Sequence, residues 1–315
     1  MGIHMSSRSR SITPNNPPAR RGPTVAEALS AAAHRLERAG VDSPGRTAEI
    51  LLCHVLQWDR LRLVLQRNMT LPHSIHQRFT RLLQRRLQRE PLQYILGETE
   101  FYGLRLRVRH GVFIPRPETE LLVEEALATA RSYGLTHLRI LDIGTGSGCV
   151  ALAVAQHCPH ASVIGVDVSV TALSLARQNA RKLGLSTVRF HYTDILRALP
   201  PGKPFHIIVA NPPYIPVTEL PHLQPEIRLY EPPSTLTDGL DGLAFYRRFA
   251  AIFPHLLFPR GSFLVEVPAG AATAVAALFQ PIAASLHIRK DYCGIERIVI
   301  GTLATDSTSC PSTVR

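Results

Sequence analysis

The spacing of apolar and polar residues divides the chain into two parts with different periodicities. Between residues 24 and 97, apolar residues recur every three or four positions, which is the pattern of amphipathic helices. Between residues 118 and 303, short β-branched apolar runs alternate with helical patterns. This alternation predicts a doubly wound α/β fold with a mostly parallel sheet, preceded by a small helical domain.

Three helices are expected in the first part. Thr24-Val-Ala-Glu27 has the form of a capping box and opens a helix that ends at Gly40. Asp42-Ser43-Pro44 opens a second helix with proline in its first turn, and a third helix begins near Ser74. The arginines of the third helix form either a solvated face or a contact with acidic protein or RNA: Arg78, Arg81, Arg85, Arg86 and Arg89.

A β-hairpin is expected between the two parts, over residues 98–117. The apolar residues from Leu104 to Val108 alternate with arginines, which is the period of a strand. His110-Gly111 is the predicted turn into a second strand over residues 112–114. The hairpin would therefore link the helical domain to the α/β domain.

The whole pattern predicts a disordered basic leader over 1–23, a helical domain for partner recognition over 24–97, the hairpin linker over 98–117, the α/β domain over 118–303 and a disordered tail over 304–315. The leader contains arginine, serine and proline without acidic residues, so an organelle transit peptide is the alternative to a disordered segment. No apolar stretch approaches the ~20 residues of a membrane-spanning helix.

The charge balance favours acidic partners. Lysine and arginine number 35 against 24 acidic residues, which gives a net charge of +11 and a pI near 10.0. Nucleic acid or a ribonucleoprotein suits such a chain, although general solubility explains the same balance. The five cysteines are scattered and include no C-x-x-C pair, which predicts a reducing compartment and argues against a disulfide framework or a zinc site.

A strand over residues 139–143 runs into a glycine-rich turn and then into a helix, which is the opening of a nucleotide-cofactor site. Glycines let the backbone approach a ligand closely, where a Cβ atom would clash. The residues expected to bind the cofactor are Asp142, Gly144, Thr145, Gly146, Ser147, Gly148, Asp167, Asp194, Ile195 and Asn211.

Three acidic residues at strand ends indicate which cofactor is bound. Asp142 directly precedes the glycines, where its carboxylate would repel a pyrophosphate but favour the cationic methionine portion of S-adenosyl-L-methionine. Asp167 ends the second strand and is expected to accept hydrogen bonds from both ribose hydroxyls. Asp194 follows a third strand over residues 187–191 and is expected to accept from the adenine amino group, with Ile195 packed on the ring.

The fourth strand, over residues 205–210, ends abruptly in Asn211-Pro-Pro-Tyr214. Pro212 and Pro213 end it because proline has no N–H for the sheet, and Asn211 stays at the edge where α/β sheets bind ligands. We expect the Asn211 side-chain oxygen and the Pro212 carbonyl to accept the two N–H groups of an amide or an aromatic amine, and Tyr214 to cover its plane. An ordinary strand-to-loop turn is the alternative.

The last third of the chain contains a long segment and then a regular alternation of elements. Residues 215–240 are rich in proline and lack periodicity, which is typical of a functional lid. The elements expected after it are a helix over 243–252 that Pro254 kinks or ends, a strand over 261–267, a helix over 271–279, and two final strands over 286–290 and 295–302.

Several motifs occur in an order that resembles one known family. They are Pro91–Gly97, Phe101-Tyr-Gly103, Ile114–Glu120, Asp142–Gly148, Asn211–Tyr214 and the set Asp291, Gly294 and Arg297. Together they resemble the HemK/PrmC family, the glutamine methyltransferases of peptide chain release factors, from about Thr24 to Leu303. The resemblance implies an S-adenosyl-L-methionine-dependent methyltransferase with a seven-stranded doubly wound sheet and an antiparallel last strand.

The same resemblance implies a substrate and a location. The substrate would be the glutamine of the Gly-Gly-Gln motif in class 1 release factors, and Asn211, Pro212, Pro213 and Tyr214 would bind it. The enzyme would be cytoplasmic in a bacterium or, alternatively, located in a mitochondrial or plastid matrix. Neither membrane association nor stable nucleic-acid binding is expected. One departure is Glu266-Val-Pro-Ala-Gly270, which lacks a glutamine that the family often has and puts a secondary contact in doubt.

Three other functions use the same motifs. The acceptor could be a glutamine of a ribosomal protein, or the exocyclic amine of a base in DNA or RNA, since Asn-Pro-Pro-Tyr also occurs in base methyltransferases. A binding protein could retain the fold without turnover. The stretch Ile114–Glu120, combined with the helical domain, favours a glutamine amide over a base.

Overall fold

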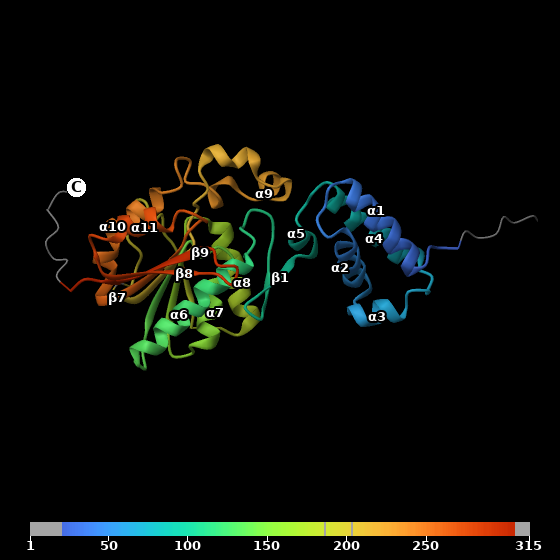
Figure 1. The fold of residues 1–315 in the computed structure, drawn as a ribbon. Coiled ribbons are helices and arrows are strands. Elements are labelled where there is room, and N and C mark those ends of the chain that lie inside the picture. The colour runs from blue at the N-terminus through green and yellow to red at the C-terminus, as the bar shows by residue number, and fades with distance from the viewer. Residues whose placement is uncertain (1–20, 186, 203, 306–315) are drawn as a thin grey trace, which may run out of the picture. The chain divides into compact units, whose positions relative to one another are not determined.

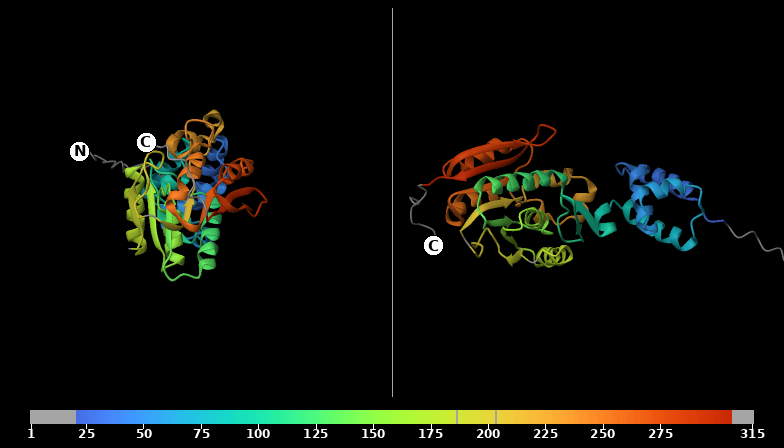
Figure 2. Two further views of the ribbon diagram at one scale, coloured as in Figure 1. Left: turned by 90° about the vertical axis from the view of Figure 1, so that its left-hand side faces the viewer. Right: turned by 90° about the horizontal axis from the view of Figure 1, so that it is seen from below.

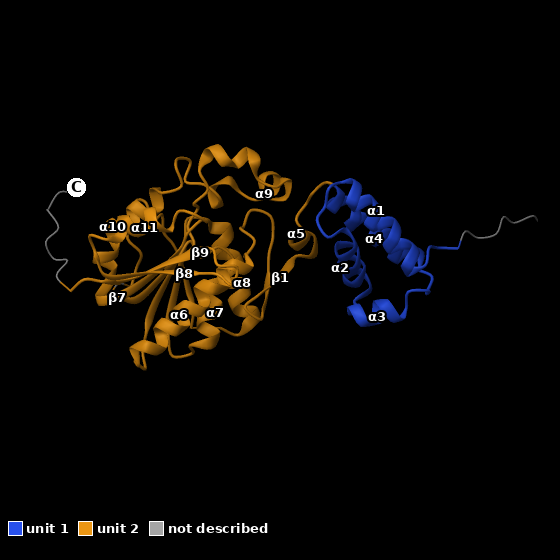
Figure 3. Ribbon diagram, viewed as in Figure 1, with its two compact units in different colours: residues 1–87 blue, residues 88–315 orange. Residues whose placement is uncertain are grey.

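The computed structural model describes residues 21–185, 187–202 and 204–305. The expectations for the leader and the tail therefore lie outside the described residues, except at 21–23 and 304–305. The chain forms two compact units, residues 1–87 and residues 88–315 (Figure 3). The division lies ten residues before the expected end of the helical domain at residue 97, because the short helix α5 (Leu92–Leu96) clusters with the second unit.

The first unit consists of the helices α1 (Val25–Arg38), α2 (Pro44–Leu56), α3 (Arg60–Leu65) and α4 (His73–Leu87) (Figure 1). The capping box of α1 is confirmed: the Thr24 hydroxyl accepts from the Glu27 amide at 3.2 Å, and the Glu27 carboxylate accepts from the Thr24 amide at 2.7 Å. The short helix α3 was not expected. Asp59 caps it by accepting from the Arg62 amide at 2.7 Å.

The expected hairpin is present, but its predicted turn is wrong. Strand β1 (Glu98–Phe101) pairs antiparallel with β2 (Leu104–Arg107), and the turn is Tyr102-Gly103. Both turn residues have positive φ, 49° and 72°, as a tight two-residue hairpin turn requires. His110-Gly111 therefore makes no hairpin turn, and residues 112–114 form no strand.

A seven-stranded sheet forms the centre of the second unit, in the order β5-β4-β3-β6-β7-β9-β8. Its strands are β3 (Arg139–Ile143), β4 (Ser162–Asp167), β5 (Arg189–Tyr192), β6 (Phe205–Ala210), β7 (Leu257–Glu266), β8 (Ala283–Lys290) and β9 (Glu296–Leu303). The last strand, β9, runs antiparallel to both of its neighbours, as expected. Figure 2 shows β8 and β9, in red, at one edge of the sheet.

Alternating side chains of the central strands form two separate cores. Ile140 and Ile207 pack against the helices α6 (Glu120–Tyr133), α7 (Cys149–His157) and α8 (Val170–Leu183). Leu141 and Ile208 point to the opposite face and pack against α10 (Ala244–Leu256) and α11 (Ala272–Phe279). The strands are apolar on both faces because helices cover both faces.

Two expectations about the last third of the chain need correction. The segment 215–240 is not wholly irregular, since it contains the turns η2 (Val217–His222) and η3 (Pro233–Thr235) and the helix α9 (Pro225–Tyr230). Helix α10 continues through Pro254 to Leu256, because a proline near the helix end interrupts only the last turn. None of the helices among the described residues is long and apolar enough to cross a membrane.

Candidate active site

A cavity of about 500 Å³ lies at the carboxyl ends of the parallel strands β3, β4, β5 and β6. The expected site residues that line it are Asp142, Gly144, Thr145, Gly146, Ser147, Asp167, Asp194, Ile195, Asn211, Pro212, Pro213 and Tyr214. Gly148 does not line it. An added Cβ atom at Gly148 would lie 3.1 Å from Leu152 and 3.2 Å from Ala176, so this glycine permits the close packing of helix and loop.

The carboxylate of Asp142 holds the glycine-rich turn in place. One carboxylate oxygen accepts hydrogen bonds from the Thr145 hydroxyl at 2.6 Å and from the Ala151 amide at 3.2 Å. Burial raises the pKa of Asp142 to about 6, and the hydrogen bond from Thr145 opposes that shift. Gly144 and Gly146 have φ of 74° and 56°, a conformation that the loop requires and that glycine adopts without strain.

Asp167 lies at the end of β4 and points both carboxylate oxygens at backbone amides. Its Oδ2 accepts from the Gly146 amide at 2.9 Å, and its Oδ1 accepts from the Ser169 amide at 2.8 Å. Burial raises the pKa of Asp167, and these backbone hydrogen bonds oppose the shift. Each oxygen keeps a lone pair that can accept from a hydroxyl, so the group suits a ribose diol.

The remaining polar groups of the cavity wall also fit a nucleoside with a charged tail. Asp194 accepts from the Leu196 amide at 3.1 Å, and the Ile195 side chain is buried beside it. The Ser147 hydroxyl is buried beside the Cys149 thiol and lowers the pKa of that thiol against the larger effect of burial. These residues therefore fit S-adenosyl-L-methionine.

The side chain of Asn211 is fixed by a residue far away in the chain. Its amide nitrogen donates a hydrogen bond to the Thr119 hydroxyl at 3.0 Å. Its carbonyl oxygen makes no hydrogen bond within the described residues, and Asn211 is one of the residues that line the cavity. Thr119 is 2% exposed and also lines the cavity. The arrangement leaves one strong acceptor available at the end of β6.

The ring of Tyr214 is anchored beneath the same wall of the cavity. Its hydroxyl donates to the Glu266 carboxylate at 3.4 Å, and its ring packs against the core beneath α10. Burial, together with the nearby Glu266 carboxylate, raises the pKa of Tyr214, so the phenol stays neutral. Glu266 is 3% exposed, and burial raises its pKa to about 7.

Thr119 and Glu266 were not predicted as site residues, although the sequence contains a signal for each. Thr119 belongs to the Ile114–Glu120 motif, which indicates the family and favours a glutamine acceptor but assigns no role to Thr119 itself. Glu266 ends an apolar strand, as Asp167 does and Asp142 nearly does, and an acidic residue in that place faces the ligand edge of the sheet.

The segment 215–240 forms part of the cavity wall. Two ion pairs connect it to residues that precede the sheet in the sequence. Ile227 of α9 lines the cavity. The Arg89 guanidinium pairs with the Glu226 carboxylate through bonds of 2.6 and 2.8 Å. Arg116 pairs with Glu231, and its guanidinium also lies 4.8 Å from the centre of the Phe113 ring. The lid-like segment is therefore held by two guanidinium–carboxylate pairs.

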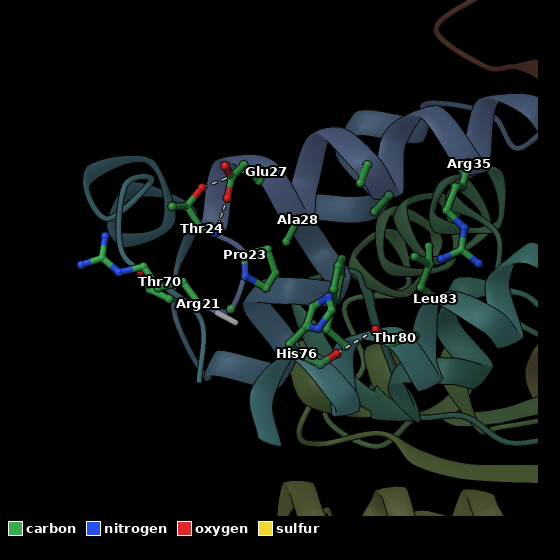
Figure 4. Close-up of a pocket in the computed structure, with 14 residues that line it drawn as sticks. Arg21, Pro23, Thr24, Glu27, Ala28, Arg35, Thr70, His76, Thr80 and Leu83 are labelled. Atoms are coloured by element: carbon green, nitrogen blue, oxygen red, sulfur yellow. Dashed lines mark hydrogen bonds between the residues drawn. The ribbon is translucent and has the colours of Figure 1, made fainter. Parts of the chain in front are cut away.

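A second cavity, of about 700 Å³, lies in the helical unit between α1 and α4 (Figure 4). Its walls include the capping box of Thr24 and Glu27, which is already hydrogen-bonded within itself, and the Thr80 hydroxyl, which donates to the His76 carbonyl at 2.8 Å. The residues lining it supply no strand-end acidic residue and no glycine-rich turn. The chemistry therefore belongs to the cavity at the sheet.

The doubly wound sheet with its antiparallel last strand and this strand-end site define an S-adenosyl-L-methionine-dependent methyltransferase. A family model described as a methyltransferase domain matches residues 136–286, and one described as the PrmC N-terminal domain matches residues 27–97. The hMettl16 catalytic domain has a similar fold, with a TM-score of 0.51 and 13% identity, covering 65% of this chain and 77% of that chain.

The named relatives show which family of methyltransferases the chain belongs to. The release factor glutamine methyltransferase of Geobacter sulfurreducens is 39% identical over 281 residues, covering 89% of this chain and 97% of that protein. The one of Thermodesulfovibrio yellowstonii is 39% identical over 260 residues, covering 81% of this chain and 91% of that protein. The chain belongs to the release factor glutamine methyltransferase family.

Proposed function

We propose that the protein transfers a methyl group from S-adenosyl-L-methionine to the side-chain amide nitrogen of the glutamine in the Gly-Gly-Gln motif of class 1 peptide chain release factors. The observation that carries the proposal is the fixed side chain of Asn211 in the cavity wall: its NH₂ donates to Thr119, and its oxygen makes no hydrogen bond within the described residues. Family membership and the names of the relatives support the acceptor.

The chemical difficulty is that an amide nitrogen is a poor nucleophile, because its lone pair is delocalised into the carbonyl group. The cofactor supplies an electrophilic methyl group on a sulfonium centre. Asn211 Oδ1 and the Pro212 carbonyl each accept one N–H of the target NH₂, and this orients the nitrogen lone pair. The two acceptors also stabilise the positive charge that develops on nitrogen.

The remaining residues of the motif limit reorganisation. Tyr214 covers the plane of the acceptor amide, and its own hydroxyl is held by Glu266. Pro212 and Pro213 restrict the backbone, so the two acceptors are in place before the substrate arrives. The nitrogen loses one proton to water after transfer, since an N-protonated amide is strongly acidic. Catalysis is orientation and electrostatic stabilisation rather than covalent catalysis.

The cofactor would be held by the residues at the strand ends. Asp167 suits the ribose hydroxyls, Asp194 and Ile195 suit the adenine ring, and the glycine-rich turn suits the methionine portion. We place the reaction in the bacterial cytoplasm, with an organelle matrix as the alternative, because the named relatives are bacterial proteins.

Radiolabelled S-adenosyl-L-methionine tests the acceptor directly. The protein is incubated with the labelled cofactor and, separately, with a class 1 release factor, ribosomal proteins, DNA or RNA. We expect label in the release factor and on its Gly-Gly-Gln glutamine, as peptide mass spectrometry would locate it. A release factor with Gly-Gly-Glu at that position is the matched control. Label in nucleic acid without label in protein would contradict the proposal.

A further inference from the structure

The backbone of Tyr214 lies directly against Gly242. An added Cβ atom at Gly242 would lie 2.2 Å from the Tyr214 carbonyl oxygen and 3.0 Å from the Tyr214 carbonyl carbon. Because close-packed atoms cannot overlap to that extent, any other residue at this position has to displace one of the two backbones. Gly242 also has φ of 82°, which glycine adopts without strain.

Two backbone hydrogen bonds hold the same region together. The Ile215 amide donates to the Leu236 carbonyl at 2.8 Å, and the Val217 amide donates to the Leu240 carbonyl at 3.0 Å. Both Ile215 and Leu236 line the cavity at the sheet. The segment 236–242 therefore fixes the backbone of the chain where it leaves the acceptor motif.

The carboxylate of Asp238 gives that segment its shape. Its Oδ1 accepts from the amides of Leu240 and Gly242 at 2.8 and 3.0 Å. Its Oδ2 accepts from the Ala244 amide at 2.9 Å. Ala244 is the first residue of α10, so the negative charge also lies at the positive end of a helix. Three backbone amides point at one side chain, and this determines where Gly242 lies.

The side chain of Tyr214 is constrained at its other end. Its hydroxyl donates to the Glu266 carboxylate at 3.4 Å, and its ring packs against the core. A shift of the Tyr214 backbone must therefore move the ring or break the contact of its hydroxyl. Tyr214 lines the cavity together with Asn211, so such a shift changes the surface on which an acceptor amide would lie.

Gly239 is a matched position in the same turn. It follows Asp238 in the sequence as Gly242 follows Asp241, and its φ of 79° is close to the 82° of Gly242. Within the described part of the chain, however, no atom beyond its own neighbours lies within 4 Å of an added Cβ at Gly239. Backbone conformation accounts for glycine at both positions, whereas the contact with Tyr214 is specific to Gly242.

We propose that Gly242 and Asp238 are positioning residues for the methyl transfer: Gly242 sets the position of the Tyr214 backbone, and the Asp238 carboxylate holds Gly242 in place. Both act through Tyr214. The inference rests on the proposed function, since it concerns the ring that covers the acceptor amide. It adds two residues from the turn before α10 to the groups on which the turnover number depends.

The first test compares Gly242→Ala with Gly239→Ala in the full chain. Both substitutions carry the same backbone strain, so the contact with Tyr214 is the difference between them. We expect kcat with the release factor to fall by about 50-fold in Gly242→Ala and by less than about threefold in Gly239→Ala. The KM for the release factor and the Kd for S-adenosyl-L-methionine should change by less than about threefold in both.

A double-mutant cycle separates positioning from general destabilisation. Tyr214→Ala removes the ring, so adding Gly242→Ala to it should lower kcat by less than about threefold further. A loss that arose from the fold as a whole would instead multiply with the effect of Tyr214→Ala.

Asp238→Asn is a milder change that tests the same contact. An asparagine amide cannot accept from all three backbone amides, and we expect kcat to fall by about tenfold, with little further loss when Tyr214→Ala is added. The control is Asp241→Asn, because the Asp241 side chain is 50% exposed and pairs with Arg247; its kcat should stay within about twofold of the wild type.

Two outcomes would overturn the inference. They are equal kcat values in Gly242→Ala and Gly239→Ala, or effects of Gly242→Ala and Tyr214→Ala that multiply. If Gly242→Ala does not fold, the cycle of Asp238→Asn with Tyr214→Ala decides in its place. Wild-type protein that does not methylate the release factor would instead contradict the proposed function, so the two failures are distinguishable.

Discussion

Arg116 and Glu231, 115 residues apart in the chain, form an ion pair in which the Glu231 side chain is only 1% exposed. Burial raises the pKa of Glu231, and the Arg116 guanidinium opposes this shift. The second oxygen of Glu231 has no hydrogen-bond partner among the described residues. The Arg116 guanidinium is the charge that favours the ionised Glu231 carboxylate, with help from the Ile114 backbone, and the pair helps to attach the segment 215–240.

Removal of that guanidinium should destabilise the protein. Arg116→Ala leaves a buried carboxylate without its cation, and we expect a loss of about 3 kcal/mol in the free energy of unfolding, measured by urea denaturation. The control is Arg247→Ala, because the Arg247–Asp241 pair is half exposed on both sides and should contribute little. If the two variants lost the same free energy of unfolding, Arg116 would contribute no more to stability than an exposed charge does.

Replacing Asn211 should impair methyl transfer without weakening cofactor binding. Asn211→Ala removes the proposed acceptor for the target N–H, and we expect kcat to fall by about 1,000-fold or more. The Kd for S-adenosyl-L-methionine, measured by calorimetry, should stay within about threefold, because the cofactor is expected to depend mainly on the strand-end acids. A matching loss of cofactor affinity would assign Asn211 to cofactor binding instead.

Replacing two glycines by alanine, one at a time, should change the stability of the protein in opposite directions. A Cβ atom at Gly165 would lie 2.7 Å from both the Thr145 hydroxyl and the Phe190 ring. Gly165→Ala must therefore displace the glycine-rich turn, and it should lower the free energy of unfolding by about 1–3 kcal/mol. It should also weaken cofactor binding. Gly45, inside α2, has nothing within 4 Å of such an atom, and Gly45→Ala should stabilise by about 0.5–1 kcal/mol. Thermal denaturation distinguishes the two signs.

The buried Glu266 should make stability depend on pH. Its folded-state pKa, about 7, lies above the ordinary value of 4.5, so the native state binds a proton more tightly than the unfolded chain. The resulting stability is present below about pH 4.5 and is lost as pH rises through about 7. Between pH 5 and pH 7.5, the free energy of unfolding measured by urea denaturation should fall by about 1–3 kcal/mol less in Glu266→Gln than in the wild type. If the unfolding free energies of the two proteins depended on pH in the same way, Glu266 would not take up a proton in the folded state.

Elements with strong local signals were predictable from the sequence. Helix α8 ends at Leu183 because the next residue, Gly184, adopts φ of 71°, and a glycine in that place is a sequence signal for a helix end. The glycine-rich turn and Asp167 also follow from short stretches of sequence. The hairpin turn was misplaced because Tyr102 adopts a positive φ, which residue type alone does not suggest for tyrosine. Helix α3 is a short helix, below the length at which periodicity becomes visible.

The contacts behind the site were not predictable in the same way. Thr119 contacts Asn211 across 92 residues, and Tyr214 contacts Glu266 across 52 residues, so neither contact leaves a pattern in a local window. The members of the pairs Arg89–Glu226 and Arg116–Glu231 are even further apart in the sequence. Sheet topology brings these residues together. The sequence indicated which residues end strands, and the fold determined their partners.

The same sequence separations imply an order of events during folding. The contacts around the cofactor are local, since Asp142 bonds Thr145 three residues away and Gly146 bonds Asp167 across 21 residues. The contacts of the acceptor site span 92 and 52 residues and need β6 and β7 in place. Because long-range contacts form after local ones, the cofactor half should consolidate first, and refolding protein should regain nucleoside affinity before it regains turnover.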